Sequence, residues 1–210
     1  MPTVSVVKCD NYELEKVYHA IHRSISLIGG IDKLVRPGMK VLLKLNLLSS
    51  SQPPERAVNT HPIVVRALVN IFQKDFGCEV YIGDSSGSVK NASTFNAFRI
   101  TRINEIAEET GAKIVNFDKD EYIDVHNKDY EIIDKFRIAR TLRTVDFIVS
   151  VPKLKTHGLT QYTGAIKNML GSIPGNGKKN VHLIAPKPTV FAKALVDIYH
   201  MVQSDITIMD

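Results

Sequence analysis

The chain has 210 residues, of which 44% are hydrophobic and 23% charged, and it carries a net charge of +5. These values are typical of a globular protein, and no apolar stretch approaches the roughly 20 residues of a membrane-spanning helix, so we expect no membrane partner. With no signal peptide at its start and two distant cysteines, Cys9 and Cys78, the chain is predicted to be cytoplasmic and to contain no disulfide framework, zinc site or iron–sulfur ligands.

The apolar periodicity of the chain predicts strands that alternate with helices. Continuous or alternating apolar runs indicate strands, whereas apolar residues three and four apart indicate helices, some of which begin at proline or end at glycine. In chain order the predicted elements are strand 3–8, helix 12–27, strand 40–48, helix 62–76, strand 78–82, helix 94–110, strand 113–117, a small antiparallel excursion near 120–140, strand 146–151, helix 163–170, helix 188–202 and strand 206–209.

This alternation favours an α/β fold with a mainly parallel, Rossmann-like sheet and helices on both faces. Ligands bind such sheets at the carboxyl ends of the strands, and three polar clusters fall at the ends of predicted strands: residues 44–46, 83–85 and 152–157. We expect residues 1–210 to form a single α/β domain. Because the last predicted strand stops at the ligand edge, we also expect this domain to be the N-terminal part of a longer protein.

The basic character of the chain is concentrated in one segment, residues 147–196, which contains no Asp or Glu. The segment holds seven lysines together with His157 and His182, while the rest of the chain has 20 basic and 22 acidic residues, a net of −2. A nearby carboxylate would neutralise the field of these cations, so the exclusion of acids indicates a segment that faces negative charge. We therefore predict a site for a small anionic ligand, a carboxylate or a phosphate.

Candidate binding residues lie at the ends of the first two buried strands. Lys44 and Asn46 are two residues apart and so share one face, although Lys44 could instead reach solvent at the strand end. Asp84 and Ser85 belong to the glycine-containing turn 83–87, which allows backbone N–H groups to approach a ligand. Asp84 is suited to orient a lysine or to bind a metal, and an ordinary tight turn is the alternative.

Two further pairs of candidates flank the helix that begins at Pro62 and the strand that ends near residue 151. Thr60 is predicted to cap the helix, so that its first-turn amides, with His61, hold an anion; an exposed helix start is the alternative. Lys153 and Lys155 project to the same side if the strand continues. A solvated basic loop is the alternative for this pair.

The segment 163–182 supplies the last candidates. Thr163 and Lys167 lie one helical turn apart on one face, with Asn168 beside them and apolar residues around them. A surface lysine is the alternative. Residues 178–182 follow a Gly-Asn-Gly sequence and are expected to form either a flexible basic loop that closes over a phosphate or carboxylate, or a disordered one.

Together these motifs resemble the domain-of-unknown-function family 362, over residues 3–210. The motifs are Lys44-Leu45-Asn46-Leu47, Thr60-His61-Pro62, Gly83-Asp84-Ser85, Pro152-Lys153-Leu154-Lys155-Thr156-His157 and Thr163-Gly164-Ala165-Ile166-Lys167-Asn168-Met169-Leu170-Gly171. The family usually has Lys-Pro-Asn where this chain has Lys44-Leu45-Asn46. The resemblance implies a second half in many members and ferredoxin-type iron–sulfur motifs in some, for which this chain has no cysteines.

The order of His157, Lys167 and His182 is also similar to that of the nickel-pincer lactate racemases. In that family a histidine precedes the lysine that holds the pincer cofactor, and an apolar stretch and another histidine follow it. The resemblance implies that Lys167 bears a nickel-pincer-like or other metal cofactor. It further implies that His157 and His182 act as a general base and as a metal ligand or second base, in a cleft between two domains.

These features favour two functions and disfavour a third. The first is an enzyme, or the cofactor-binding half of one, in which lysines neutralise a small anionic substrate, His157 and His182 move protons or hold a metal, and Lys167 is the anchor. Its reaction is racemase- or isomerase-like, or associated with an oxidoreductase. The second is a redox accessory protein that docks a ferredoxin-like module through the basic segment. Nucleic-acid binding is disfavoured, because the segment has no arginine and the chain has no known nucleic-acid motif.

Overall fold

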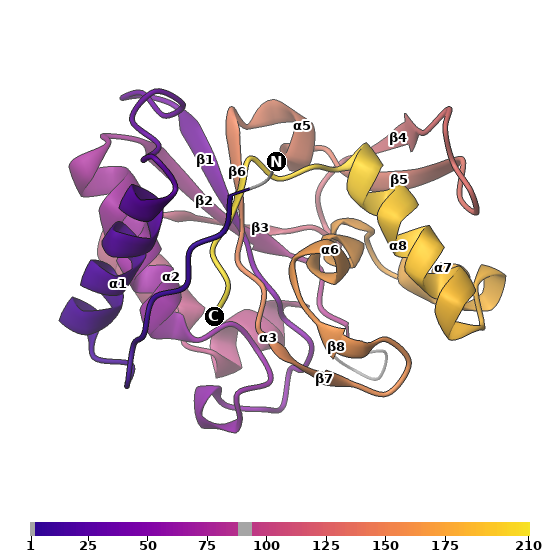
Figure 1. Ribbon diagram of the computed structural model, residues 1–210, viewed down its shortest axis with the longest axis horizontal. Coiled ribbons are helices and arrows are strands. Elements are labelled where there is room, and N and C mark those ends of the chain that lie inside the picture. Colours follow the sequence, from indigo (N-terminus) through magenta and orange to yellow (C-terminus); the bar gives the residue numbers. More distant parts are fainter. Residues whose placement is uncertain (1–2, 88–93) are drawn as a thin grey trace.

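The computed structural model describes residues 3–87 and 94–210 and is built around a five-stranded parallel sheet (Figure 1). The strands run in the order β3-β2-β1-β6-β9. Their bounds are Lys113–Asn116, Glu79–Asp84, Lys40–Lys44, Phe147–Ser150 and Ile206–Thr207, respectively. The strand order changes direction between β1 and β6, and open α/β sheets bind ligands beside such a switch point. The predicted parallel, Rossmann-like sheet is confirmed.

The carboxyl ends of the inner strands are level with one another. Lys44 of β1 pairs with Gly83 of β2 on one side and with Ser150 of β6 on the other, and Asp84 pairs with Asn116 of β3. The parallel register therefore brings polar residues that are distant in sequence to a single edge of the sheet.

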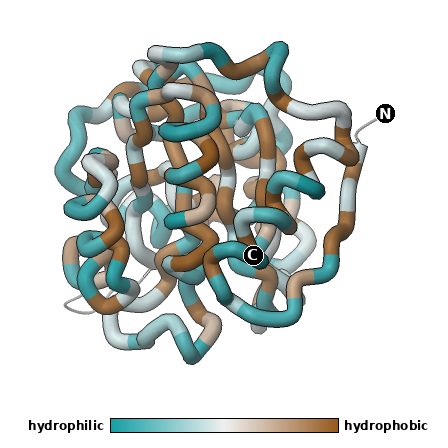
Figure 2. Tube along the Cα trace, turned by 90° about the vertical axis from the view of Figure 1, so that its left-hand side faces the viewer, coloured by the Kyte–Doolittle hydropathy of each residue, from teal (hydrophilic) through white to brown (hydrophobic). Residues whose placement is uncertain are grey.

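Four helices cover one face of the sheet. They are α1 (Leu14–Leu27), α2 (Pro62–Asn70), which continues into a π-helical segment (Ile71–Asp75), α3 (Thr94–Ile100) and α4 (Ile103–Thr110). Val41, Leu43 and Val149 belong to the buried cluster beneath these helices. Figure 2 looks onto this side and shows hydrophobic residues recurring between hydrophilic ones along the helical coils, the pattern of helices with one buried stripe.

The opposite face is covered by the later part of the chain (Figure 1). Its elements are the antiparallel hairpin β4 (Tyr122–His126) and β5 (Lys135–Ala139), α5 (Thr141–Thr144), α6 (Ala165–Asn168) with the 3-10 turn Met169–Ser172, α7 (Gly177–Ile184) and α8 (Pro188–Met201). Leu42 and Ile148 belong to the cluster on this side. Strands buried on both faces explain the continuous apolar runs of the sequence, and the predicted antiparallel excursion is confirmed.

Two expectations about local structure are wrong. Residues 3–8 form no strand, because Val4 and Val6 are 82% and 92% exposed and pair with no other strand, although their alternation imitates one. The helix predicted over 94–110 is broken between α3 and α4, where Arg102 adopts a left-handed conformation with φ 58°. The Thr101 hydroxyl donates to the carbonyl of Ala97 at 2.7 Å and helps to end α3.

Two more differences lie in the basic segment. The hairpin β7 (Lys155–His157) and β8 (Gln161–Thr163) follows β6 where a loop or a continued strand was expected. Thr163, which was expected to begin a helix and to share a helical face with Lys167, lies in β8, before α6 begins. Residues 178–182, expected as a flexible or disordered loop, lie in α7. A short 3-10 turn, Pro54–Arg56, interrupts the loop after β1. None of the helices in the described parts of the chain has both the length and the hydrophobicity that crossing a bilayer requires.

Candidate functional site

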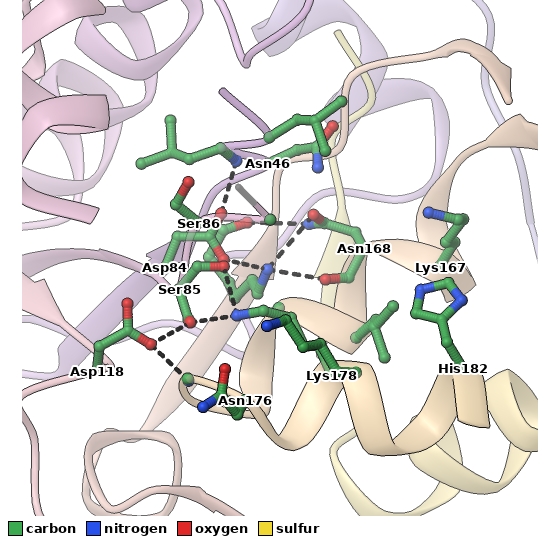
Figure 3. A pocket seen from close by; sticks show the side chains of 18 of the residues that line it. Asn46, Asp84, Ser85, Ser86, Asp118, Lys167, Asn168, Asn176, Lys178 and His182 are labelled. Carbon is green, nitrogen blue, oxygen red and sulfur yellow. Dashed lines mark hydrogen bonds and ion pairs between the residues drawn. The ribbon is translucent and has the colours of Figure 1, made fainter. Parts of the chain in front are cut away.

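A cleft opens at the carboxyl edge of the sheet, beside the switch point between β1 and β6 (Figure 3). It encloses about 270 Å³, just below the roughly 300–1,000 Å³ of sites for drug-sized ligands, and so has room for a small molecule. Its polar lining comes from the ends of β1, β2 and β3, from β7, and from α6 and α7. The polar side chains are Lys44, Asn46, Asp84, Ser85, Ser86, Asp118, His157, Lys167, Asn168, Asn176, Lys178, Lys179 and His182.

The floor of the cleft is a buried ion pair. Lys44 Nζ lies 2.7 Å from Asp84 Oδ1, and neither side chain is more than 2% exposed. Lys44 also donates to the carbonyls of Leu45 and Asn168, each at 2.8 Å, and Asp84 accepts the Leu47 N–H at 2.6 Å. Burial lowers the pKa of Lys44 and raises that of Asp84, and their mutual attraction opposes both shifts. The two charges cancel, so the pair adds no net charge to the cleft.

Asn168 bridges the two strands at the switch point. Its Nδ2 donates to the carbonyl of Lys44 at 3.2 Å and to the Ser150 hydroxyl at 3.0 Å, and the residue is 2% exposed. These bonds hold α6 against the ends of β1 and β6. Asn168 therefore positions its neighbour Lys167 at the wall of the cleft.

Gly171 packs directly on the buried ion pair. A Cβ atom at this position would lie 2.4 Å from Lys44 Nζ and 2.5 Å from Asp84 Oδ1, far inside van der Waals contact. Glycine is required here by the space above the pair, since its φ is not positive.

We expect Gly171→Ala to lower the free energy of unfolding by roughly 1–3 kcal/mol, the usual cost of overpacking a buried site. Urea denaturation measures this change. Gly158→Ala is the matched control, because a Cβ there meets nothing within 4 Å and its φ is not positive either. Equal losses in both variants would contradict the role assigned to Gly171.

Asp118 organises the opposite wall of the cleft. It accepts hydrogen bonds from the hydroxyls of Ser85 and Thr94 and, at 2.7 Å, from the Gly175 N–H. Lys178 donates to the hydroxyl of Ser85 and, at 3.1 Å, to the carbonyl of Ser85. This network ties the start of α7 to the end of β2 (Figure 3).

Burial and this network shift the pKa values of the two ionisable groups, Asp118 and Lys178. Burial raises the pKa of Asp118, but the hydrogen bonds from Ser85, Thr94 and the Gly175 N–H, together with the charge of Lys178, outweigh it and leave the pKa below its usual value. Burial lowers the pKa of Lys178 to about 8. Sequence reasoning missed Asp118, although it directly follows the predicted strand 113–117, as the other polar clusters follow theirs.

The polar atoms of the Lys167 and His182 side chains are not held by hydrogen bonds within the described chain. Among the described residues, neither the Lys167 amine nor the His182 ring nitrogens have a hydrogen-bond or ion-pair partner. Burial and then the nearby Lys44 lower the pKa of Lys167, while burial and then Lys167 lower that of His182. His182 stacks on Phe191 at 4.4 Å, and Figure 3 shows it next to Lys167.

The hydrogen bonds of His157 determine which nitrogen carries its proton. Nδ1 accepts the N–H groups of Leu159 at 3.2 Å and Thr160 at 3.3 Å, so we assign the proton of the neutral ring to Nε2. Burial lowers the pKa of His157, and the nearby Lys167 and His182 lower it further. The neutral ring is therefore a hydrogen-bond donor in the cleft. Acting as a base or metal ligand through Nε2 requires the proton to move to Nδ1 and both bonds to break.

Three of the predicted site residues, Lys155, Asn46 and Thr60, link the chain segments that follow β1 and β6. Lys155 Nζ donates to Asn46 Oδ1 at 2.8 Å, and burial lowers the Lys155 pKa to about 8. The Thr60 hydroxyl accepts the Asn46 N–H at 2.9 Å and donates to the Val151 carbonyl at 2.7 Å. Thr60 is not the N-cap of α2; His61 is, because its Nδ1 accepts the N–H of Ile63 at 3.2 Å.

Lys153 and His61 lie in a separate cluster with Tyr12 and Asp210. Lys153 Nζ is 2.7 Å from the Tyr12 hydroxyl and 3.0 Å from Asp210 Oδ1, and the His61 ring stacks on Tyr12 at 3.6 Å. Lys153 and Lys155 therefore do not face one ligand together, because the chain turns into β7 between them. Lys153, His61 and the buried Thr163 are not part of the lining of the cleft.

The fold and the cleft together define an α/β protein with a Rossmann-like sheet and a small Lys- and His-lined site at its switch point. The family model for "Domain of unknown function (DUF362)" matches residues 41–210, and the chain belongs to this family. The resemblance predicted from the motifs is confirmed.

One sequence relative and two solved structures of similar fold are all longer than this chain. It is 28% identical over 211 residues to the thylakoid-associated protein sll1697 of Synechocystis sp., a match that covers 99% of this chain and 62% of that protein. Its fold is similar to that of a Thermotoga maritima protein solved by structural genomics, with a TM-score of 0.61 and 14% identity, over 98% of this chain and 52% of the other. It is also similar to the lactate racemase apoprotein from Thermoanaerobacterium thermosaccharolyticum, with a TM-score of 0.58 and 11% identity, over 92% and 48%. The chain thus spans 62% of the first relative and about half of each structure, and the structural likeness shows the fold alone.

Proposed function

We propose that the cleft binds a small anion with a carboxylate or phosphate group, as part of an enzyme or of the cofactor-binding half of one. One observation carries this proposal: both carboxylates that line the cleft are engaged by the protein, whereas the Lys167 amine has no partner in the described chain. A half-buried ammonium without a counter-ion is costly, and an anionic ligand would offset that cost.

The remaining polar groups support the same ligand class. Asp84 is neutralised by Lys44, and Lys178 lies beside the carboxylate wall formed by Asp118. Lys167 and the exposed Lys179 are left as positive charges, and His157 adds an N–H donor. The cleft therefore presents donors and positive charge to a ligand with one or two negative charges.

Calorimetric titration tests this proposal. Lactate and inorganic phosphate serve as anionic probes, and glycerol is the neutral control of similar size. We expect at least one anion to bind, with an affinity that falls as salt is added, and glycerol not to bind. Absence of binding by both anions, or equal binding of glycerol, would overturn the proposal.

We expect anion affinity to fall as the pH rises through about 8. The pKa of Lys178 lies near that value, and the pKa of Lys167 is also lowered, so the cleft loses positive charge in this range. The protonated lysines attract the anion, so the anion affinity decreases as they lose their protons. Titrations across this range measure it. In Lys178→Arg the fall in anion affinity near pH 8 should become smaller, because a guanidinium stays protonated. An unchanged fall would exclude Lys178 as its cause.

A cofactor attached to Lys167 is a second candidate. Lys167 lies in one cleft with the imidazoles of His157 and His182, and an amine without a partner fits a covalent anchor. Such a group would supply a metal centre next to the bound anion. Within residues 3–87 and 94–210, no three His, Cys, Asp or Glu side chains are grouped so as to hold a metal by themselves. Intact mass and metal analysis of protein purified from its native host test this candidate, which an unmodified, metal-free chain would contradict.

The redox accessory role rests on the family association alone. Lys153, Lys155, Lys167 and Lys178 of the basic segment are buried or partly buried, so they do not form an exposed docking face. Lys179, Lys187 and Lys193 are the exposed lysines of this segment. The absence of nucleic-acid binding stays a prediction. We keep the proposal that residues 1–210 form one domain, the N-terminal part of a longer protein, which agrees with the greater length of its relatives.

A further inference from the structure

The lysines of the cleft differ in what their amines contact. Lys44 has a carboxylate and two carbonyls as acceptors, and Lys178 has the hydroxyl and carbonyl of Ser85. Lys167 has no acceptor anywhere in the described chain, although it is partly buried and held in place by its neighbour Asn168. Its amine is therefore free to react with a ligand.

The surroundings of Lys167 make its neutral, nucleophilic form easier to reach than that of a lysine in solvent. Burial disfavours the ammonium form, and the charge of Lys44 behind it acts in the same direction, so the pKa of Lys167 is lowered. A lysine that is desolvated or placed beside another cation is a common covalent nucleophile toward carbonyl groups.

The cleft also offers groups for the rest of such a ligand. His157 presents an N–H donor, and Lys179 on α7 adds a positive charge, so a carboxylate is accommodated beside the amine. We propose that Lys167 forms a Schiff base with the carbonyl carbon of a small 2-oxo acid whose carboxylate is bound in this cleft. The inference rests on the proposed anion-binding function and names its substrate class.

The chemistry needs no oxidant, reductant or metal. The amine lone pair forms the new C–N bond, the carbonyl π electrons move to oxygen, and one proton moves from nitrogen to that oxygen, which gives a carbinolamine. A further proton is then taken up by the hydroxyl oxygen. The C–O bond then breaks and its oxygen leaves as water. In sum, one neutral amine, one carbonyl and one proton give one iminium ion and one water molecule.

Reductive trapping tests the inference. The full-length protein is incubated with pyruvate and sodium cyanoborohydride, which reduces an iminium ion to a stable secondary amine, and is then analysed by intact mass and peptide mapping. We expect a mass increase equal to one pyruvic acid molecule less one oxygen atom, located at Lys167. Lys187→Arg, which changes an exposed lysine of the basic segment outside the lining of the cleft, should still be trapped at Lys167. Lys167→Arg should lose the trapped adduct but, with its charge kept, should still bind lactate, which has no ketone.

The outcomes separate this inference from the anion-binding proposal. If lactate binds but pyruvate leaves no adduct at Lys167, or modifies surface lysines equally, the Schiff base is excluded and anion binding stands. If neither acid binds but inorganic phosphate does, the Schiff base is excluded and anion binding stands; if none of the three binds, both proposals fail. Thermal unfolding of Lys167→Arg, compared with that of the unmodified chain, establishes that the variant is folded.

Discussion

Replacing Asp84 by asparagine is expected to lower the free energy of unfolding by roughly 3–5 kcal/mol, because it leaves a buried ammonium without its counter-ion. Lys44 is completely buried, and its two carbonyl contacts to Leu45 and Asn168 cannot neutralise its charge. Asparagine also cannot offer the Leu47 N–H and Lys44 two negatively charged oxygens at once. Urea denaturation of the variant and the unmodified chain gives the difference.

Two variants sharpen this test. Asp124→Asn removes a carboxylate from the exposed pair with Arg137, 3.2 Å long, and should cost less than about 1 kcal/mol. The double variant Lys44→Met/Asp84→Leu should recover much of the stability, since apolar replacements of a buried pair are often neutral. A small loss in Asp84→Asn, close to that of Asp124→Asn, would show that the pair is not the structural centre of the cleft.

Lys167→Met is expected to reduce the affinity for the anion that binds best by about 10- to 100-fold, equivalent to roughly 1.5–3 kcal/mol for a charge-assisted contact. Stability should not fall, because the Lys167 amine has no partner among the described residues. Calorimetry and thermal unfolding on the same samples separate the two effects.

The matched control for this prediction is Lys179→Met, which removes an exposed lysine of the same cleft. We expect it to weaken binding less than Lys167→Met does, because solvent screens an exposed charge. Lys167→Arg should retain most of the affinity. Equal losses in the two methionine variants would mean that the cleft acts through its overall charge and that Lys167 has no special role.

Much of the fold was predictable because it depends on local patterns. Buried parallel strands produce continuous apolar runs, and the alternation with helices leaves few topologies. The strand predicted over 3–8 was wrong for a related reason: alternation reports which side chains share a face and not whether a partner strand exists. The break between α3 and α4 was missed because it depends on Thr101 and on a left-handed Arg102, which no periodicity reveals.

The site was predictable in part. Lys44, Asp84, Ser85, His157, Lys167, Asn168 and His182 were all predicted, and all line one cleft. Lys153 and His61 were placed with them because they are basic and follow strand or loop ends, but they contact Tyr12 and Asp210 outside the cleft. The direction of Lys153 depends on where the chain turns after β6, and that of His61 depends on its packing against Tyr12; residue types specify neither.

The sequence by itself determined the family, the parallel sheet and the concentration of lysines between residues 147 and 196, because these follow from motifs, periodicity and composition. Only the tertiary structure decided which lysines of the cleft have acceptors within the described chain and which do not. Lys44 and Lys178 are held by groups that lie 40 and 93 residues away in sequence. Lys167 stands in the same cleft without such a partner in the described chain. Ion pairing and burial depend on distances between side chains, and those distances are set by the packing of the sheet and its helices.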